Sequence, residues 1–316
     1  MIARTAAALA ALLLSGCASF FTPPQTAALL ASPPQDLPAR VERTEVPFFP
    51  QTRDHCGPAA LATALAHAGL PADPDRLADA VFLPSRAGTL QLEMLGGARR
   101  QGALATKLPR ELPALLREVA AGHAVVVLQN LGLDLIPRWH YAVVVGYDLA
   151  TREVVLRSGT TERAVLPLRT FEYTWARGGH WAIAVLPPGQ LPATAREADA
   201  LDAAVGFERA ASPARAALAY QALLARWPGN LLAGIGLGNT RAAAGDAAGA
   251  RAAFEAVATQ HDSAVAWINL ARLRLDAGDR AGALAAARQG LQRANAAEPA
   301  WRDAAIATLA ALDAQR

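Results

Sequence analysis

Cysteine and lysine are scarce in this 316-residue sequence: cysteine occurs only at Cys17 and Cys56, and lysine is almost absent beside arginine. Neither cysteine belongs to a Cys-x-x-Cys pair or has a histidine cluster around it, so no metal site and no cofactor are expected. Charged residues make up 18% and are scattered, with a formal net charge of +3. Without a basic patch, the composition gives no indication of nucleic-acid binding. The length and the 53% hydrophobic content fit two globular domains.

The first residues have the pattern of a targeting segment. Arg4 precedes an apolar run that is shorter than the ~20 residues needed to span a bilayer. This is typical of a secretory signal. The segment Leu14-Ser15-Gly16-Cys17 resembles the lipobox of bacterial lipoproteins. That resemblance implies that residues 1–16 are a cleaved lipoprotein signal peptide and that Cys17 is lipidated; the alternative is a plain signal peptide with an incidental cysteine.

The residue after that cysteine is Ala18 and not aspartate. By the same resemblance, this implies an outer-membrane lipoprotein facing the periplasm of a Gram-negative bacterium, with lipid on Cys17 as its contact with the membrane. Residues 17–43 contain proline pairs and small residues and are expected to form a tether. With Cys17 lipidated, Cys56 is the remaining thiol, and in an oxidising compartment such a thiol is a liability unless it is buried or used.

Region 44–190 is predicted to be an α+β domain, because helical signals come first and strand signals follow. Helical spacing and helix-end residues mark the ranges 57–69, 74–82, 88–102 and 112–121. Runs rich in β-branched residues predict strands at 124–129, 140–147, 153–157, 163–168 and 180–186. Pro187-Pro188-Gly189 marks the end of the domain.

Region 195–316 shows helical signals only, and they repeat. Tyr220, Phe254 and Ala287 are 34 and 33 residues apart, and Gly245-Asp246 recurs as Gly278-Asp279. A period near 34 residues resembles the tetratricopeptide repeat. The resemblance implies clear units at 230–263 and 264–297, a degenerate unit at 197–229, and a surface that binds a protein partner.

The chemistry is concentrated around Cys56. Gly57-Pro58 follow it and open an amphipathic helix, so Cys56 is expected at a helix amino terminus, where the positive potential favours thiolate over thiol. A thiolate attacks carbonyl carbon, and backbone N–H groups there can face a developing oxyanion. Gln51 precedes the cysteine by five residues, and its amide can donate a second hydrogen bond to that oxyanion.

The base must come from elsewhere in the chain. His140 opens an apolar strand and is suitably placed to meet a helix-start cysteine across a cleft. Gln51, Asp54-His55-Cys56-Gly57-Pro58 and His140-Tyr141 with the valine run that follows resemble the bacteriocin-processing, double-glycine peptidase family, which has the papain-like fold. The resemblance implies Cys56 as nucleophile, His140 as base and Gln51 as oxyanion donor. The best-known members cut leader peptides and are fused to transporters; that substrate is not carried over, because no transporter segment is present.

One residue of the family pattern is missing. Members usually have an aspartate on the next strand to orient the imidazole, whereas a hairpin around residues 148–151 places Ser158 and Gly159 beside His140. Ser158 can accept the imidazole N–H without supplying charge. Asp148 is not a substitute, because eight residues along one strand separate it from His140 by roughly 26 Å.

The expected architecture is therefore an α+β papain-like cysteine peptidase domain followed by an all-α tetratricopeptide-like repeat domain. The first functional hypothesis is an envelope-anchored cysteine peptidase acting on a protein or peptide substrate. The second is a non-catalytic lipoprotein scaffold that keeps a degenerate peptidase domain for protein interaction. A third is a cell-wall amidase, against which Cys56-Gly57-Pro58 argues, because that papain-like group typically has Asp-Cys-Ser-Gly.

Overall fold

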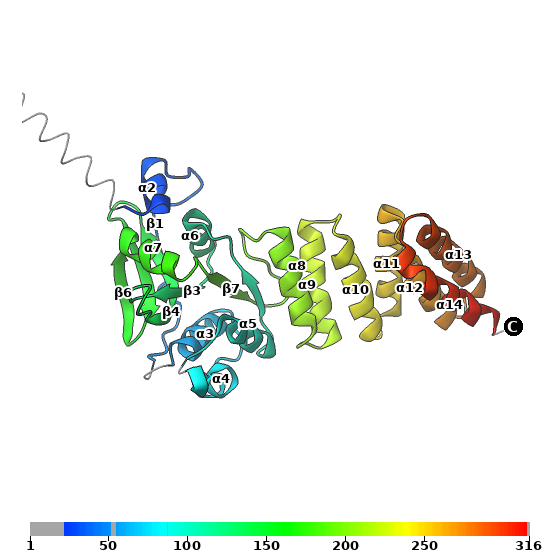
Figure 1. The fold of residues 1–316 in the computed structure, drawn as a ribbon, viewed down its shortest axis with the longest axis horizontal. Helices are drawn as coiled ribbons and strands as arrows, with labels where there is room; N and C mark the ends of the chain where they lie inside the picture. Colours follow the sequence, from blue (N-terminus) through cyan, green and yellow to red (C-terminus); the bar gives the residue numbers. More distant parts are fainter. Residues whose placement is uncertain (1–21, 52–54, 87, 315–316) are drawn as a thin grey trace, which may run out of the picture. The chain divides into compact units, whose positions relative to one another are not determined.

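The computed structural model describes residues 22–51, 55–86 and 88–314 (Figure 1). The predicted signal segment, Cys17 and Ala18 lie outside the described residues. The chain forms two compact units. The first unit runs to Pro187 and includes Pro192–Asp199, and the second unit consists of Pro188–Leu191 and the chain from Ala200 onward.

The first unit is built around an antiparallel sheet with the strand order β2-β7-β3-β4-β5-β6, in which β1 also pairs with β4. Its central strands are nearly continuous apolar runs because both faces of the sheet are covered. The strands are β1 Arg40–Glu42, β2 Leu104–Lys107, β3 Val125–Asn130, β4 Trp139–Asp148, β5 Glu153–Ser158, β6 Thr161–Pro167 and β7 Ala182–Leu186.

Helices cover both faces of this sheet (Figure 1). Along β4, Tyr141, Val143 and Val145 join one buried cluster, and Ala142 and Val144 join the other. This alternation follows from the two-residue period of a strand. On the first face lie α3 Cys56–His67, α4 Pro74–Val81 and α5 Gln91–Arg100; on the second lie α2 Pro24–Ala31, α6 Leu112–Ala120 and α7 Leu168–Arg177.

Part of the segment expected to be a tether is folded into the first unit. Within residues 22–43, α2 and β1 form, and Leu29 is buried against the second face of the sheet. The carboxylate of Glu172 on α7 accepts the backbone N–H groups of Gln25 and Thr26 and so caps α2 from outside. Proline pairs and small residues indicated a tether, but apolar side chains between them pack on the core.

The second unit is all-helical and confirms the predicted repeat. The expected units 197–229, 230–263 and 264–297 coincide with successive helix pairs. The helices are α8 Glu197–Glu208, α9 Pro213–Arg226, α10 Leu231–Ala243, α11 Ala247–His261, α12 Ala264–Asp276, α13 Arg280–Ala296 and α14 Arg302–Asp313, with α8 beginning in the first unit.

The recurring Gly-Asp pairs form the turns inside the repeats. Gly245 and Gly278 have φ values of +82° and +79°, which glycine adopts at low cost. The carboxylates of Asp246 and Asp279 then cap the following helices by accepting the N–H groups of Gly249 and Gly282. The same local chemistry thus repeats in both units.

Close helix packing explains why the first clear repeat departs from the consensus. A Cβ on Gly234, at the position that Trp267 takes in the next unit, would lie 2.3 Å from a methyl carbon of Val257 on α11.

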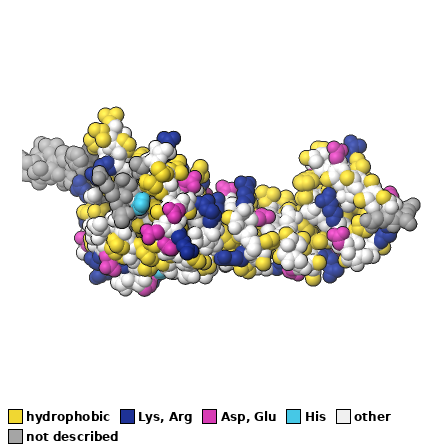
Figure 2. Space-filling view, turned by 90° about the horizontal axis from the view of Figure 1, so that it is seen from below, with side chains coloured by type: hydrophobic (Ala, Val, Ile, Leu, Met, Phe, Trp, Pro, Cys, Tyr) yellow, Lys and Arg dark blue, Asp and Glu magenta, His cyan; other side chains and the backbone are white. Residues whose placement is uncertain are grey.

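Among the described residues, no helix is long and apolar enough to cross a membrane. On the face shown in Figure 2, Lys and Arg side chains are interspersed with Asp, Glu and apolar ones.

Candidate active site

Cys56 is the first residue of α3, as the sequence predicted. The helix starts after His55, whose carbonyl accepts the N–H of Ala59 at 3.2 Å. The first N–H groups of an α-helix have no intrahelical partner four residues back. Gly57 is required sterically, because a Cβ there would lie 2.6 Å from the side chain of Thr89. The Cys-Gly-Pro motif therefore combines a half-buried thiol at the helix start with close packing behind it.

Gln51 and Cys56 line the same small pocket at the edge of the sheet. The segment from residue 47 to Gln51 has no regular secondary structure, and the backbone N–H of Gln51 donates to the carbonyl of Gly159 at 3.1 Å. This bond attaches the segment to the turn between β5 and β6. The pocket is lined by Phe48, Phe49, Gln51, Cys56, Ala59, Ala60, Thr63, Tyr141, Arg157, Ser158 and Gly159.

His140 lies on β4, opposite Gln129 of β3, and is 9% exposed. Burial, with the positive charge of Arg138 as a second cause, lowers the pKa of His140 below its usual value of 6.5. The imidazole is therefore neutral at neutral pH, which is the form that accepts a proton. His140 itself is not among the pocket-lining residues.

Ser158 connects His140 to that pocket. Its Oγ lies 2.8 Å from Nε2 of His140, and Ser158 also lines the pocket of Cys56 and Gln51. The sequence predicted this neighbour, although the hairpin register differs slightly: Val143 pairs with Arg157, and the register shifts again between Val144 and Gly146. An extra residue of this kind is a β-bulge, which sequence spacing does not reveal.

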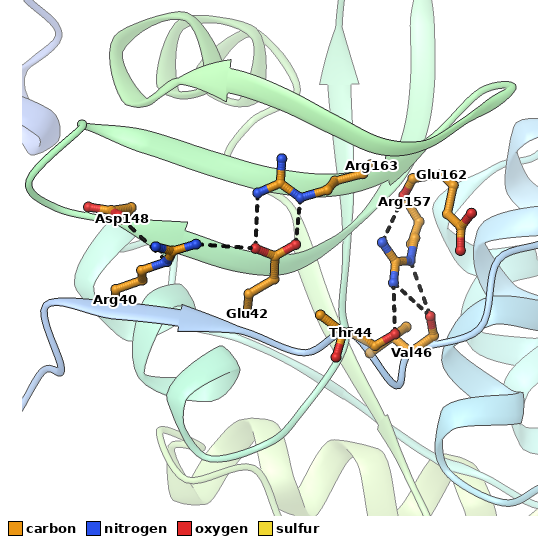
Figure 3. Close-up of polar contacts among 8 residues, drawn as sticks. All are labelled: Arg40, Glu42, Thr44, Val46, Asp148, Arg157, Glu162 and Arg163. Carbon is orange, nitrogen blue, oxygen red and sulfur yellow. Dashed lines mark hydrogen bonds and ion pairs between the residues drawn. The ribbon is translucent and has the colours of Figure 1, made fainter.

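Asp148 lies at the opposite end of β4 from His140, in agreement with its rejection as the orienting residue. It is in the surface charge cluster of Figure 3, where one carboxylate oxygen is 3.7 Å from Nε of Arg40. The other carboxylate oxygen accepts the N–H groups of Ala150 and Thr151 and closes the β4–β5 turn. Asp148 therefore stabilises the hairpin.

Tyr141 and Arg157 also line the pocket and were not identified from the sequence as part of the site. Tyr141 follows His140, and burial together with the charge of the nearby Cys56 raises the pKa of its hydroxyl well above 10. Arg157 precedes Ser158 and is buried. Tyr141 resembles an ordinary residue of an apolar strand, and no local pattern marks Arg157. The ring of His55, the neighbour of Cys56, contacts Phe82 edge to face with 4.8 Å between ring centroids.

An apolar hairpin, defined as residues 131–139, leads directly into His140. Asn130 at its base accepts the N–H groups of Gly132 and Arg138, and Arg177 of α7 donates to the carbonyl of Asn130. The large hydrophobic side chains of this hairpin are solvent-exposed although its backbone is well bonded. They are Leu131, Leu133, Leu135, Ile136 and Trp139, of which Leu135 is 95% exposed.

The described part of the chain contains no group of three or more His, Cys, Asp or Glu side chains arranged to hold a metal ion. The polar chemistry of this pocket comes instead from a thiol, an amide, a hydroxyl and, next to it, an imidazole. Such groups are those of nucleophilic acyl transfer.

The helix that starts at Cys56 packs against an antiparallel sheet whose strand β4 carries His140, as in a papain-like fold. Residues 43–183 match the profile of the Peptidase_C39 like family. This part of the chain therefore has a C39-like peptidase fold, and it is followed by a helical domain with tetratricopeptide-like repeats. No curated protein matches the sequence.

Several solved structures are similar to the chain. One is a C39-like peptidase from Bacillus anthracis, with 20% identity, a TM-score of 0.40, and coverage of 46% of this chain and 97% of that chain. Another is the peptidase domain of Streptococcus ComA, a bifunctional ABC transporter, with 20% identity, a TM-score of 0.37, and coverage of 45% and 98%. A TPR protein of Thermus thermophilus has 19% identity, a TM-score of 0.31, and coverage of 36% and 64%.

Proposed function

We propose that the first unit is a cysteine peptidase in which Cys56 is the nucleophile, His140 the base and Gln51 an oxyanion donor. The observation that supports this most is that Cys56, Gln51 and Ser158 line one pocket while Ser158 contacts His140 at 2.8 Å. Gln51 and Cys56 lie near the start of the domain. His140 and Ser158 lie on the adjacent strands β4 and β5, about ninety residues later in the sequence.

The proposed reaction has two steps. In the first, Sγ of Cys56 bonds to the substrate carbonyl carbon, and the Gln51 amide and the N–H groups at the start of α3 bind the oxyanion. The C–N bond then breaks, and the amine leaves with the proton that His140 took from the thiol. In the second step, water attacks the thioester, gives one proton to His140 and releases the carboxylic acid, and the thiol is restored.

The contact with Ser158 suits this role of His140. Ser158 Oγ accepts the proton on Nε2, which leaves Nδ1 as the nitrogen that exchanges a proton with Cys56. Burial keeps the imidazole neutral because it lowers the His140 pKa. The imidazole is thus held as a base without a carboxylate partner.

The apolar hairpin supplies a wall for an apolar part of the substrate. His140 protonates the leaving amine, so the substrate residues after the scissile bond pass on the His140 side of the site. The hairpin ends at Trp139, next to His140. Ile136 precedes His140 by four residues, and a peptide of four residues spans about 13 Å when extended. The proposed substrate is therefore a protein segment with apolar residues on that side.

Attachment to the outer membrane through lipid on Cys17 is part of the proposal. Only the residues between Cys17 and Thr22 separate the predicted lipid site from the described part of the first unit. At ~3.5 Å per residue, that length holds the domain within roughly 20 Å of the bilayer. The predicted tether is therefore short, and substrates near the membrane surface are favoured.

The repeat unit is proposed to bind a protein partner or the substrate. A groove of about 400 Å³ lies between helices α10 and α12 and the segment before α14. Exposed Leu232 and Trp301 contribute apolar surface to it, and Asn239 and Asn269 contribute amides that can bind a peptide backbone. Apolar and amide groups together fit an unstructured protein segment better than a charged ligand.

A non-catalytic scaffold is the second candidate, and the neutral Ser158 beside His140 is the observation that favours it. The two candidates differ in the reactivity of Cys56. We expect an iodoacetamide probe to label Cys56 rapidly at mildly acidic pH and to do so at least ~10-fold more slowly in His140→Ala. The matched control His123→Ala removes a histidine that pairs with Glu118 outside the pocket, and labelling should be unchanged.

Proteolysis itself is tested by comparing new protein amino termini in the cell envelope of wild-type and Cys56→Ala strains. Amino termini that disappear in Cys56→Ala, and that recombinant wild-type protein regenerates, support the peptidase. Slow labelling that ignores His140, together with identical amino termini in both strains, would show that the domain is a scaffold.

A further inference from the structure

Arg157 is a buried cation with an unusual set of partners. The residue is 7% exposed, and its guanidinium donates to backbone carbonyls of three residues. Nε and Nη2 reach the carbonyl of Val46 at 3.1 and 3.0 Å, Nη2 reaches Thr44 at 3.3 Å, and Nη1 reaches Glu162 at 2.8 Å (Figure 3). No carboxylate within the described residues forms an ion pair with it.

Burying the charged guanidinium of Arg157 destabilises the fold unless its partners compensate for the lost hydration. A cation that leaves water loses its hydration, which a counter-charge or several hydrogen bonds must replace. Arg163, on the neighbouring strand, shows the inexpensive alternative: it is half exposed and pairs with Glu42 at 2.7 Å (Figure 3). Arg157 instead uses its planar fork on main-chain oxygens, a geometry that lysine does not reproduce.

Those bonds hold the segment that leads to Gln51. Thr44 and Val46 begin the stretch without regular structure that ends at Gln51, and Arg157 fixes its start. Its end is fixed by the bond from Gln51 N–H to Gly159. Arg157 and Gly159 flank Ser158, the partner of His140. Residues 157–159 therefore hold the segment that leads to Gln51 and also supply Ser158, the residue that contacts the imidazole of His140.

The strand is irregular at this point. The register between β5 and β6 shifts between Leu156 and Ser158, where two steps along β5 match three along β6, so Arg157 lies opposite a β-bulge in β6. A bulge redirects a side chain relative to a regular ladder, and bulges are frequent beside active sites. Here the Arg157 side chain crosses from the sheet to the Gln51 segment and also lines the Cys56 pocket.

We propose that Arg157 is a positioning residue that acts through Gln51: it holds the irregular segment so that the Gln51 amide stays in place for the oxyanion. The inference deepens the proposed peptidase function and depends on it. Its consequence is specific. Loss of Arg157 should slow reactions that develop an oxyanion and should leave the intrinsic reactivity of the Cys56 thiol unaffected.

Two probes separate these effects, both used on the full chain in a Cys17→Ser background so that Cys56 is its only thiol. Iodoacetamide alkylates sulfur without forming an oxyanion. A p-nitrophenyl ester acylates it through a tetrahedral oxyanion: the S–C bond forms, p-nitrophenolate leaves and the thiol proton passes to His140. In Arg157→Lys, we expect alkylation within about 2-fold of the wild type and acylation about 10-fold slower. Gln51→Ala should lose about 100-fold in acylation, as expected for one oxyanion donor.

The double variant Arg157→Lys with Gln51→Ala provides the decisive comparison. Because Arg157 acts through Gln51, the double variant should acylate no more than 2-fold slower than Gln51→Ala alone. Arg163→Lys, which loses an equivalent fork on the same hairpin, should behave as wild type. If Arg157→Lys does not fold, as judged by circular dichroism, Arg157→Met replaces it and removes the buried charge.

Each other outcome overturns the inference. Multiplying losses in the double variant would show that Arg157 acts independently of Gln51. Equal slowing of both probes would show an effect on the thiol or on the whole fold. Failure of the wild type to acylate while Cys56 alkylates normally would refute the peptidase function itself. This result differs from a failure of the Arg157 inference, because it is seen in the wild type without any variant.

Discussion

The substitution Ser158→Asp tests how His140 is controlled, because it introduces the carboxylate that the peptidase family usually has at this position. Ser158 Oγ lies 2.8 Å from Nε2 of His140, so the new charge would lie about 4 Å from the imidazolium charge. At that distance two opposite charges attract by about 1 kcal/mol in water and about 4 kcal/mol at an effective dielectric constant of 20. With 1.36 kcal/mol per pKa unit, the pKa of His140 should rise by about 1 to 3 units.

The measurement is an NMR titration of the imidazole, with the His140 signal assigned by its loss in His140→Gln. The isosteric control Ser158→Asn adds the same volume without charge and should shift the His140 pKa by less than about 0.5 units. Equal shifts in the Asp and Asn variants, or a wild-type His140 that titrates above 6.5, would refute the reasoning. In the wild type, burial is the first cause of the lowered His140 pKa and Arg138 is the second.

The same substitution should reverse a pH dependence of stability. In the wild type, the folded state disfavours protonated His140, so stability relative to His140→Gln is lost as pH falls below 6.5 toward the lowered pKa. In Ser158→Asp, the raised pKa contributes stability that is fully present below 6.5 and is lost as pH rises through the folded-state value. Urea unfolding at pH 5, 6.5 and 8 distinguishes the two signs.

Two further predictions concern other parts of the first unit. Glu118 is fully buried and binds His123 and the backbone and hydroxyl of Thr194, so Glu118→Ala should cost about 3 kcal/mol of unfolding free energy in urea. Burial would raise the Glu118 pKa, but the hydrogen bonds from His123 and Thr194 outweigh it and lower the pKa; the loss should therefore shrink below about pH 4.5, and a constant loss down to pH 3 would contradict this. Leu135→Ser with Ile136→Ser should leave stability within about 0.5 kcal/mol, because both side chains are exposed. This double variant should reduce kcat/KM roughly 10-fold only for peptides with apolar residues after the scissile bond; an equal reduction for polar peptides would exclude the apolar wall.

The sequence alone determined the features that depend on local chemistry. Gly57-Pro58 after Cys56 predicted the helix start, because proline fits the first turn of a helix. The recurring Gly-Asp pairs predicted the repeat turns, since a left-handed glycine followed by a capping aspartate is a local unit. Valine-rich runs predicted β3 and β4, because β-branched side chains favour strands.

Two helices of the first unit were missed. In helix α7, Leu168, Phe171 and Trp175 follow helical spacing and bury fully against the sheet, so the sequence carried a signal that the element assignment passed over. Helix α2 was hidden among prolines, and its amino-terminal N–H groups are capped by Glu172, about 150 residues away. A contact with so distant a partner leaves no trace in the neighbouring sequence.

The tertiary structure also decided how the candidate site is held together. Sequence spacing placed Ser158 near His140, but the bulges in β4 and β6 set the actual register. Nothing in the sequence indicated that Arg157 would bind the carbonyls of Thr44 and Val46, more than 110 residues earlier. The physical reason is that backbone carbonyls are the same at every residue, so only the folded chain determines which of them a buried guanidinium can reach.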